Sequence, residues 1–130
     1  MNKIKLNLGC GKDIIEGYVN IDIKPDDPKA KYGDFCNLVY PSQSVNDIRA
    51  IDVIEYVPIK NLASVITGWL DKLEKGGNIY IESLDYNKLG TQMCYEQIGT
   101  DLINTLIFTD YTDRPNKCAL YNLVCIDIFL

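Results

Sequence analysis

Residues 6–13, Leu-Asn-Leu-Gly-Cys-Gly-Lys-Asp, form the stretch that decides the fold. An alternating apolar run ends at Leu8 and is followed at once by two glycines one residue apart, Gly9 and Gly11. The first glycine lets the chain leave a strand in a conformation that other residues resist. The second removes a side chain where a ligand would touch the backbone. A second apolar run ends at Asp22, a residue that could accept hydrogen bonds from both hydroxyls of a ribose. The pattern indicates a crevice for a nucleoside.

The glycine pattern differs from that of a dinucleotide site. Ile14 stands where a third glycine would complete Gly-x-Gly-x-x-Gly. Asp22 also follows the glycines sooner than the roughly 20 residues that are typical of dinucleotide folds. The short crossover, residues 9–18, leaves room for only a very short helix at about residues 12–16. The alternative is that Gly9 and Gly11 form an ordinary turn between a strand and a helix.

Length and charge limit the classes of function. A chain of 130 residues suits a single domain over residues 1–130, and its apolar fraction of 47% fits a soluble globular protein. No apolar run reaches the roughly 18 residues needed to span a membrane. The 13 basic and 18 acidic residues give a net charge of −5, which argues against sequence-independent binding to nucleic acid.

Cysteine and histidine usage narrow the chemistry. Five cysteines with no Cys-x-x-Cys spacing, together with an N-terminus that enters a strand without a signal peptide, favour a reduced, cytoplasmic setting and no metal site. The sequence has no histidine, which removes the commonest general base. Any chemistry must therefore use carboxylates, tyrosines, lysines or the substrate itself.

Strand and helix patterns alternate along the chain. The clearest helix lies at residues 59–73, where apolar residues recur at helical spacing and include Trp69 as a core residue, with Gly76 expected just after its end. Strands are expected at residues 4–8, 19–23, 31–33, 46–52 and 78–82. Residues 24–29 are expected to form a loop, residues 86–98 and 101–108 helices, and residues 118–130 a helix or a terminal strand. The alternation predicts an α/β fold with ligands at the carboxyl ends of parallel strands.

Several segments, in the right order, resemble the class I S-adenosylmethionine-dependent methyltransferases, in particular the small predicted-methyltransferase type. Residues 6–11 resemble the first motif of that family, and residues 17–22 resemble its second strand. Residues 33–35 are similar to the segment that meets adenine, and residues 73–81 to the Leu-Lys-Pro-Gly-Gly turn into the fifth strand. Residues 53–57 stand where the family often has Val-Leu-Glu-His-Val.

The resemblance implies a Rossmann-like, mostly parallel sheet with helices on both faces and S-adenosyl-L-methionine as the cofactor. It implies that the first motif wraps the methionine part, that Asp22 binds the ribose and that Asp34 meets the adenine amino group. The alternative for Asp34 is a turn residue after Gly33. The cofactor-binding residues expected on this basis are Leu8, Gly9, Cys10, Gly11, Asp22, Ile23, Asp34, Phe35 and Asp52.

Two acidic residues after the fourth expected strand are the candidates for catalysis. Methyl transfer from a sulfonium is an in-line displacement, so the enzyme mainly holds donor and acceptor in line. A hydroxyl or amine acceptor must also lose a proton, and Asp52 or Glu55 could remove it. The alternative for both residues is a helix-capping or solvated carboxylate.

The sequence also departs from the family. Tyr56 replaces the usual His, Asp52 stands where His is common, and Glu74-Lys75 replaces Lys-Pro. The family closes its sheet with an antiparallel hairpin, and that hairpin is missing if residues 118–130 are the last helix. The chain would then be truncated at its C-terminus, or a partner would cover the edge. We expect a second copy to cover it in a homo-oligomer, in preference to a tail that covers its own edge.

The absence of two motifs narrows the acceptor. The sequence contains neither the Asn/Asp-Pro-Pro-Tyr motif of base amine methylation nor the Pro-Cys dipeptide of cytosine methylation. A small molecule, a sugar or a lipid is therefore the expected acceptor, and a protein side chain stays open. The first alternative function is a non-catalytic module or subunit that binds S-adenosylmethionine. The second is an NAD-dependent enzyme, which the incomplete glycine motif disfavours.

Overall fold

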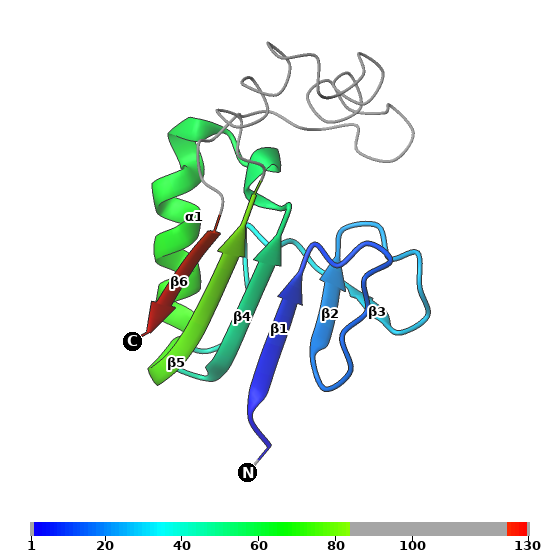
Figure 1. Cartoon of the computed structure of the whole chain (residues 1–130), viewed down its shortest axis with the longest axis horizontal. Coiled ribbons are helices and arrows are strands. Elements are labelled where there is room, and N and C mark those ends of the chain that lie inside the picture. Colours follow the sequence, from blue (N-terminus) through cyan, green and yellow to red (C-terminus); the bar gives the residue numbers. More distant parts are fainter. Residues whose placement is uncertain (1, 84–124, 130) are drawn as a thin grey trace, which may run out of the picture.

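The structure, a computed structural model, describes residues 2–83 and 125–129, which form one six-stranded sheet (Figure 1). The strand order is β3-β2-β1-β4-β5-β6, and β1 to β5 are parallel. The predicted α/β class and the Rossmann-like parallel sheet are confirmed. The elements are β1 (Ile4–Leu8), β2 (Val19–Asp22), β3 (Ala30–Tyr32), β4 (Val45–Ile51), the 3-10 helix η1 (Ile54–Tyr56), α1 (Ile59–Lys72), β5 (Leu73–Glu82) and β6 (Cys125–Phe129).

Alternating apolar residues build the core between the sheet and α1. Leu6 and Leu8 of β1 are at most 1% exposed, and Trp69 of α1 is as deeply buried. Fully burying one such aliphatic side chain is worth about 1.5–3 kcal/mol. The same face includes Ile48 and Ala50 of β4 and Ile79 and Ile81 of β5. Helix α1 lies along this face (Figure 1), so the prediction that Trp69 belongs to the core is confirmed.

The other face of the sheet is polar in the part of the chain that the structure describes. The hydroxyl of Tyr18 donates to Asp47 Oδ2 at 2.8 Å, and the guanidinium of Arg49 lies 4.9 Å from the centre of the Tyr80 ring. Only α1 covers the sheet among the described residues. The helices expected at residues 86–98 and 101–108 lie outside that part, and helices on both faces stay a prediction.

The junction between α1 and β5 differs from the expected glycine turn. The helix ends at Lys72, and Leu73 is already extended, with φ −68° and ψ 134°. Leu73 is 3% exposed and pairs with Val45, so its burial against β4 ends the helix before the glycines. Gly76, with φ +81°, lies inside β5 instead of just after the helix.

The edge of β5 is covered by the chain's own tail. β6 pairs antiparallel with β5, with Ile128 opposite Ile79 and Cys125 opposite Glu82. Of the two states left open for residues 118–130, the strand is therefore the one found at Cys125–Phe129. The expectation of a sheet that ends at the fifth strand was wrong, because β6 takes up the free hydrogen-bonding groups of β5. The homo-oligomer stays a prediction. One antiparallel strand is present among the described residues, and no second strand of a hairpin is.

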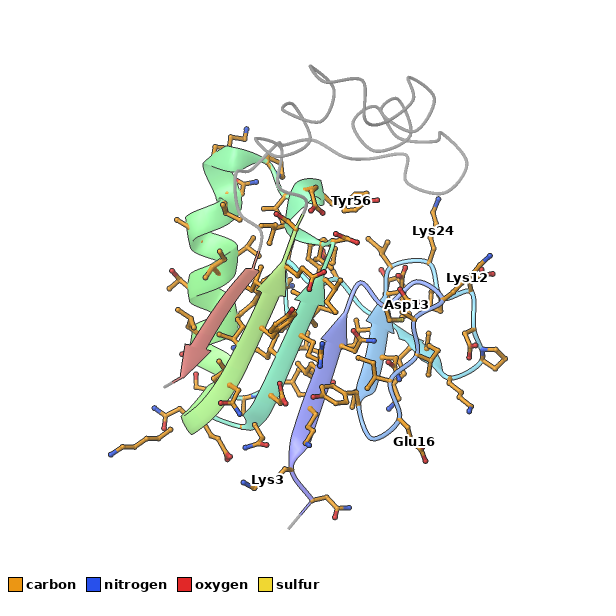
Figure 2. The ribbon with its side chains drawn as sticks, viewed as in Figure 1. Lys3, Lys12, Asp13, Glu16, Lys24 and Tyr56 are labelled. Atoms are coloured by element: carbon orange, nitrogen blue, oxygen red, sulfur yellow. The ribbon has the colours of Figure 1, made fainter. Side chains whose placement is uncertain are left out.

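The first crossover is turn-like throughout. Residues 12–16 contain no helix, contrary to the short helix expected there. Figure 2 shows that the crossover runs down the sheet, with Asp13 near the carboxyl ends of the strands and Glu16 near their amino ends. Among the described residues, no helix is long and apolar enough to cross a membrane.

Candidate functional site

The sheet topology itself marks one crevice. From β1 the chain moves to β2 and β3 on one side, and then crosses back to β4 on the other side of β1. The connections that leave β1 and β4 therefore diverge at the carboxyl ends of these strands, which is where open α/β sheets bind ligands. The glycine loop follows β1, Asp22 ends β2 and Asp52 follows β4. The fold brings these three predicted elements to the same edge.

The two glycines of the loop have different roles. Both have left-handed backbones, with φ +59° at Gly9 and +52° at Gly11. A Cβ at Gly9 would lie 2.7 Å from Val53 Cγ2, so Gly9 allows the loop to pack against the segment after β4. A Cβ at Gly11 would meet nothing within 4 Å, so Gly11 faces open space. Leu8 is 1% exposed, so its side chain belongs to the core.

Asp22 ties the glycine loop to the end of β2. Its Oδ2 accepts a hydrogen bond from Gly11 N at 2.9 Å, and its Oδ1 accepts one from Lys24 N at 2.8 Å. Each oxygen keeps a further lone pair, so the carboxylate can still accept from a ligand hydroxyl. Beside it, the apolar side chain of Ile23 is 54% exposed.

The loop also holds a cysteine that does not face solvent. Cys10 is buried, and its N–H donates to Ile21 O at 3.0 Å. Burial raises the pKa of the Cys10 thiol, and the negative charge of Asp22 raises it further. Cys10 is therefore a neutral packing residue whose backbone alone lines the loop.

The segment after β3 is bound to the core by Phe35, its third residue. Asp34 is exposed, and its Oδ1 accepts from Cys36 N at 2.8 Å, which makes it a turn residue with one oxygen still free of that bond. The carbonyl of Phe35 accepts from Trp69 Nε1 at 2.6 Å, and the two rings meet edge to face, with centroids 6.4 Å apart. The half-buried Phe35 thus anchors Asp34 near the edge of the sheet.

The two candidate bases lie in different surroundings. Asp52 is half-buried with a left-handed backbone, φ +54°, and its N–H donates to Glu82 O at 2.9 Å. Such a conformation is uncommon outside glycine, although Asp adopts it more readily than most residues. Glu55, on η1, is fully buried, so a solvated role for Glu55 was the wrong alternative. Asp52 is thus the candidate nearer to solvent.

Sequence reasoning missed a buried amide pair. Asn7 and Asn20 are each 4% exposed, and Asn7 Nδ2 donates to Asn20 Oδ1 at 2.8 Å. The sequence pattern assigned neither asparagine a role in the site. The available signal was an amide enclosed by apolar residues in each of two predicted strands.

Comparison with known proteins bears on the fold. The chain is similar in structure to a protein assigned as a methyltransferase, solved in complex with the Haloferax volcanii Trm112 methyltransferase activator; the identity is 15%, the match covers 73% of this chain and 51% of that chain, and the TM-score is 0.53. The likeness shows the fold alone, which is a Rossmann-like methyltransferase fold. This chain spans about half the length of that solved chain.

A second solved structure is less similar. It is phosphoethanolamine N-methyltransferase 2 of Haemonchus contortus in complex with S-adenosyl-L-methionine, with 15% identity, coverage of 82% of this chain and 32% of that chain, and a TM-score of 0.46. No family model matches the sequence, and no curated protein matches it.

Proposed function

We propose that this methyltransferase-fold chain binds S-adenosyl-L-methionine at the carboxyl ends of β1, β2 and β4 and transfers its methyl group to a hydroxyl or amine of a small molecule, a sugar or a lipid. The observation that carries the proposal is the hydrogen bond from Gly11 N to Asp22 Oδ2, 2.9 Å long, beside the point between β1 and β4 where the strand order reverses. It joins a loop open to a ligand with an acid suited to a ribose.

The described residues fit such a cofactor. The space in front of Gly11 leaves room for a ligand against the backbone of the loop. The remaining lone pairs of Asp22 suit the two ribose hydroxyls, and the exposed side chain of Ile23 offers an apolar surface for a flat ring. The oxygen of Asp34 that Cys36 does not use suits an amino group.

The proposed reaction requires little acid–base catalysis from the protein. The cofactor would supply a methyl group already activated on a sulfonium. The protein's part is to hold the acceptor in line and to take its proton. Asp52 is half-buried just after β4. The hydrogen bond from its N–H to Glu82 O fixes the position of its backbone, from which the carboxylate extends. We assign the proton acceptor to Asp52, because Glu55 is fully buried and offers no surface to an acceptor.

A non-catalytic module that binds S-adenosylmethionine is the second candidate. The burial of Glu55 favours it, because one of the two candidate bases has no surface to offer an acceptor. This candidate predicts cofactor binding without turnover.

Two measurements separate the candidates. Calorimetric titration with S-adenosylmethionine, S-adenosylhomocysteine and NAD should show binding of the first two ligands only. Binding of NAD alone would overturn the proposal in favour of a dehydrogenase. A mass-spectrometric screen of hydroxyl and amine metabolites for a product heavier by one methylene should then yield a methylated acceptor. Cofactor binding with no product in any class would leave the non-catalytic module as the function.

A further inference from the structure

Two buried amides face each other across the first two strands. Asn7 of β1 and Asn20 of β2 are paired residues in the parallel ladder, and each is 4% exposed. Asn7 Nδ2 donates one of its two hydrogen bonds to Asn20 Oδ1 at 2.8 Å. Polar groups buried this deeply are costly unless they are hydrogen-bonded, so what they bind indicates what they are for.

Asn20 holds the far end of the crossover. Its Oδ1 accepts from Ile15 N at 2.9 Å, and its Nδ2 donates to Ile15 O at 3.1 Å and to Tyr18 O at 3.2 Å. The amide of Asn20 therefore binds both the N–H and the C=O of Ile15, as the backbone of a neighbouring strand would. This replaces the helix that a longer crossover would use to cross the sheet.

Asn7 holds the near end, next to the glycine loop. Its Nδ2 donates its second hydrogen bond to Asp13 O at 2.8 Å. Asp13 N in turn donates to Cys10 O at 2.8 Å, and Cys10 N donates to Ile21 O at 3.0 Å. Gly11 and Lys12 therefore lie between two residues whose backbones are fixed by hydrogen bonds, Cys10 on one side and Asp13 on the other.

We propose that the Asn7–Asn20 amide pair positions the backbone of Gly11 against the cofactor. The ligand part of this inference rests on the function proposed above. Asn7 and Asn20 are positioning residues, since their buried side chains reach the crossover and not the crevice. The pair requires amides: Asn7 uses both of its protons, and a carboxylate there would place an oxygen against Asp13 O and Asn20 Oδ1.

The decisive variant is Asn7→Asp, which keeps the volume of the side chain and removes its donors. Amide hydrogen exchange, measured by NMR without ligand, should become at least about tenfold faster at Gly11, a residue that Asn7 does not touch. A side chain that merely filled space would leave Gly11 unchanged in this variant. Unchanged exchange at Gly11 in a folded Asn7→Asp protein would overturn the proposal.

The matched control is Asn46→Asp. Asn46 Nδ2 donates to Glu74 Oε1 at 2.6 Å at the amino-terminal end of β4, so this variant also sets two oxygens against each other, far from the loop. Exchange at Gly11 should match that of the unmodified protein. If Asn7→Asp does not fold, Asn7→Ala is measured instead, with the same outcome required at Gly11.

Ligand titration gives a second readout. S-adenosylhomocysteine, which carries the amino acid part, should bind Asn7→Asp about tenfold more weakly, whereas adenosine should lose less than about threefold. Equal losses for both ligands would mean a general structural role and would overturn the positioning role. If the unmodified protein binds neither ligand, the proposed function fails, and exchange at Gly11 still decides whether the amide pair positions the loop.

Discussion

The carboxylate of Asp22 accepts the backbone N–H of Gly11 at 2.9 Å, so the acid at the end of β2 holds the loop that follows β1. Its other oxygen accepts Lys24 N at 2.8 Å. The residue therefore shapes the crevice before any ligand arrives. This arrangement is preorganised, since a ligand that meets a fixed loop does not have to order it on binding.

Replacing Asp22 with Ala should weaken binding of S-adenosylmethionine at least about tenfold. Each charge-assisted hydrogen bond to a ribose hydroxyl is worth roughly 1.5–3 kcal/mol, and the variant also releases Gly11 N. Isothermal titration measures the loss. Asp26→Ala is the control, because Asp26 is an exposed acid of the following loop that pairs only with Lys12 at 3.8 Å among the described contacts. Equal affinity of the two variants would remove Asp22 from the site.

The two glycines of the loop should respond differently to alanine. Both substitutions force a left-handed backbone on alanine, which costs about 1–2 kcal/mol. Gly9→Ala adds a collision with Val53, so its free energy of unfolding should fall by about a further 1–3 kcal/mol. Gly11→Ala should bind the ligand more weakly instead, because its Cβ would enter the open space in which the cofactor is proposed to lie.

Chemical denaturation and titration separate the two effects of these glycines. Gly17→Ala is the matched control, since Gly17 has φ +82° and nothing within 4 Å of a Cβ, and it lies away from the loop. It should show the backbone cost alone. A Gly9→Ala protein as stable as Gly17→Ala would contradict the packing role of Gly9.

The sequence predicts the parallel strands well because each is a short apolar run beside a turn. The expected strand at residues 4–8 coincides with β1, and Asp22 falls at the carboxyl end of β2 as expected. The end of α1 was not predictable from local signals, because the pairing of Leu73 with Val45 overrode the glycines. The amide pair was missed for a similar reason: the roles of Asn7 and Asn20 depend on which backbone groups the crossover brings to them.

Trp69→Phe should destabilise the protein by about 2 kcal/mol or more. The indole N–H donates to Phe35 O at 2.6 Å, and phenylalanine would leave that carbonyl without its donor and open space in the core. Circular dichroism during thermal unfolding measures the change. Thr67→Ala, on the exposed side of the same helix, is the control and should stay within about 0.5 kcal/mol of the unmodified protein. A loss for Trp69→Phe no larger than that of the control would contradict the tie between α1 and the Phe35 segment.

Asp52→Asn should slow turnover strongly and leave stability unchanged. Asparagine tolerates the left-handed backbone at this position about as well as aspartate, so the fold is retained. A general base typically contributes 10²–10⁴-fold, and the rate of S-adenosylhomocysteine formation with an acceptor found by the screen should drop by about that factor. Asp47→Asn, which alters a carboxylate inside β4 that accepts the hydroxyl of Tyr18, is the control and should keep full turnover. Full activity of Asp52→Asn would mean that the acceptor loses its proton to another group.

Cys10 should make stability fall at high pH. Burial and the charge of Asp22 hold the pKa of its thiol above the ordinary value, so the folded protein keeps this proton where the unfolded chain has lost it. The contribution is fully present below the ordinary thiol pKa, about 8.5, and is lost as the pH rises through the raised pKa of the folded state. Cys10→Ser, which does not titrate in this range, should flatten the decline in unfolding free energy above about pH 8.5.

Alkylation by iodoacetamide, followed by separate quantification of the peptides that carry Cys10 and Cys36, should show the exposed Cys36 reacting first. Equal rates for the two thiols at pH 8 would contradict a buried, neutral Cys10.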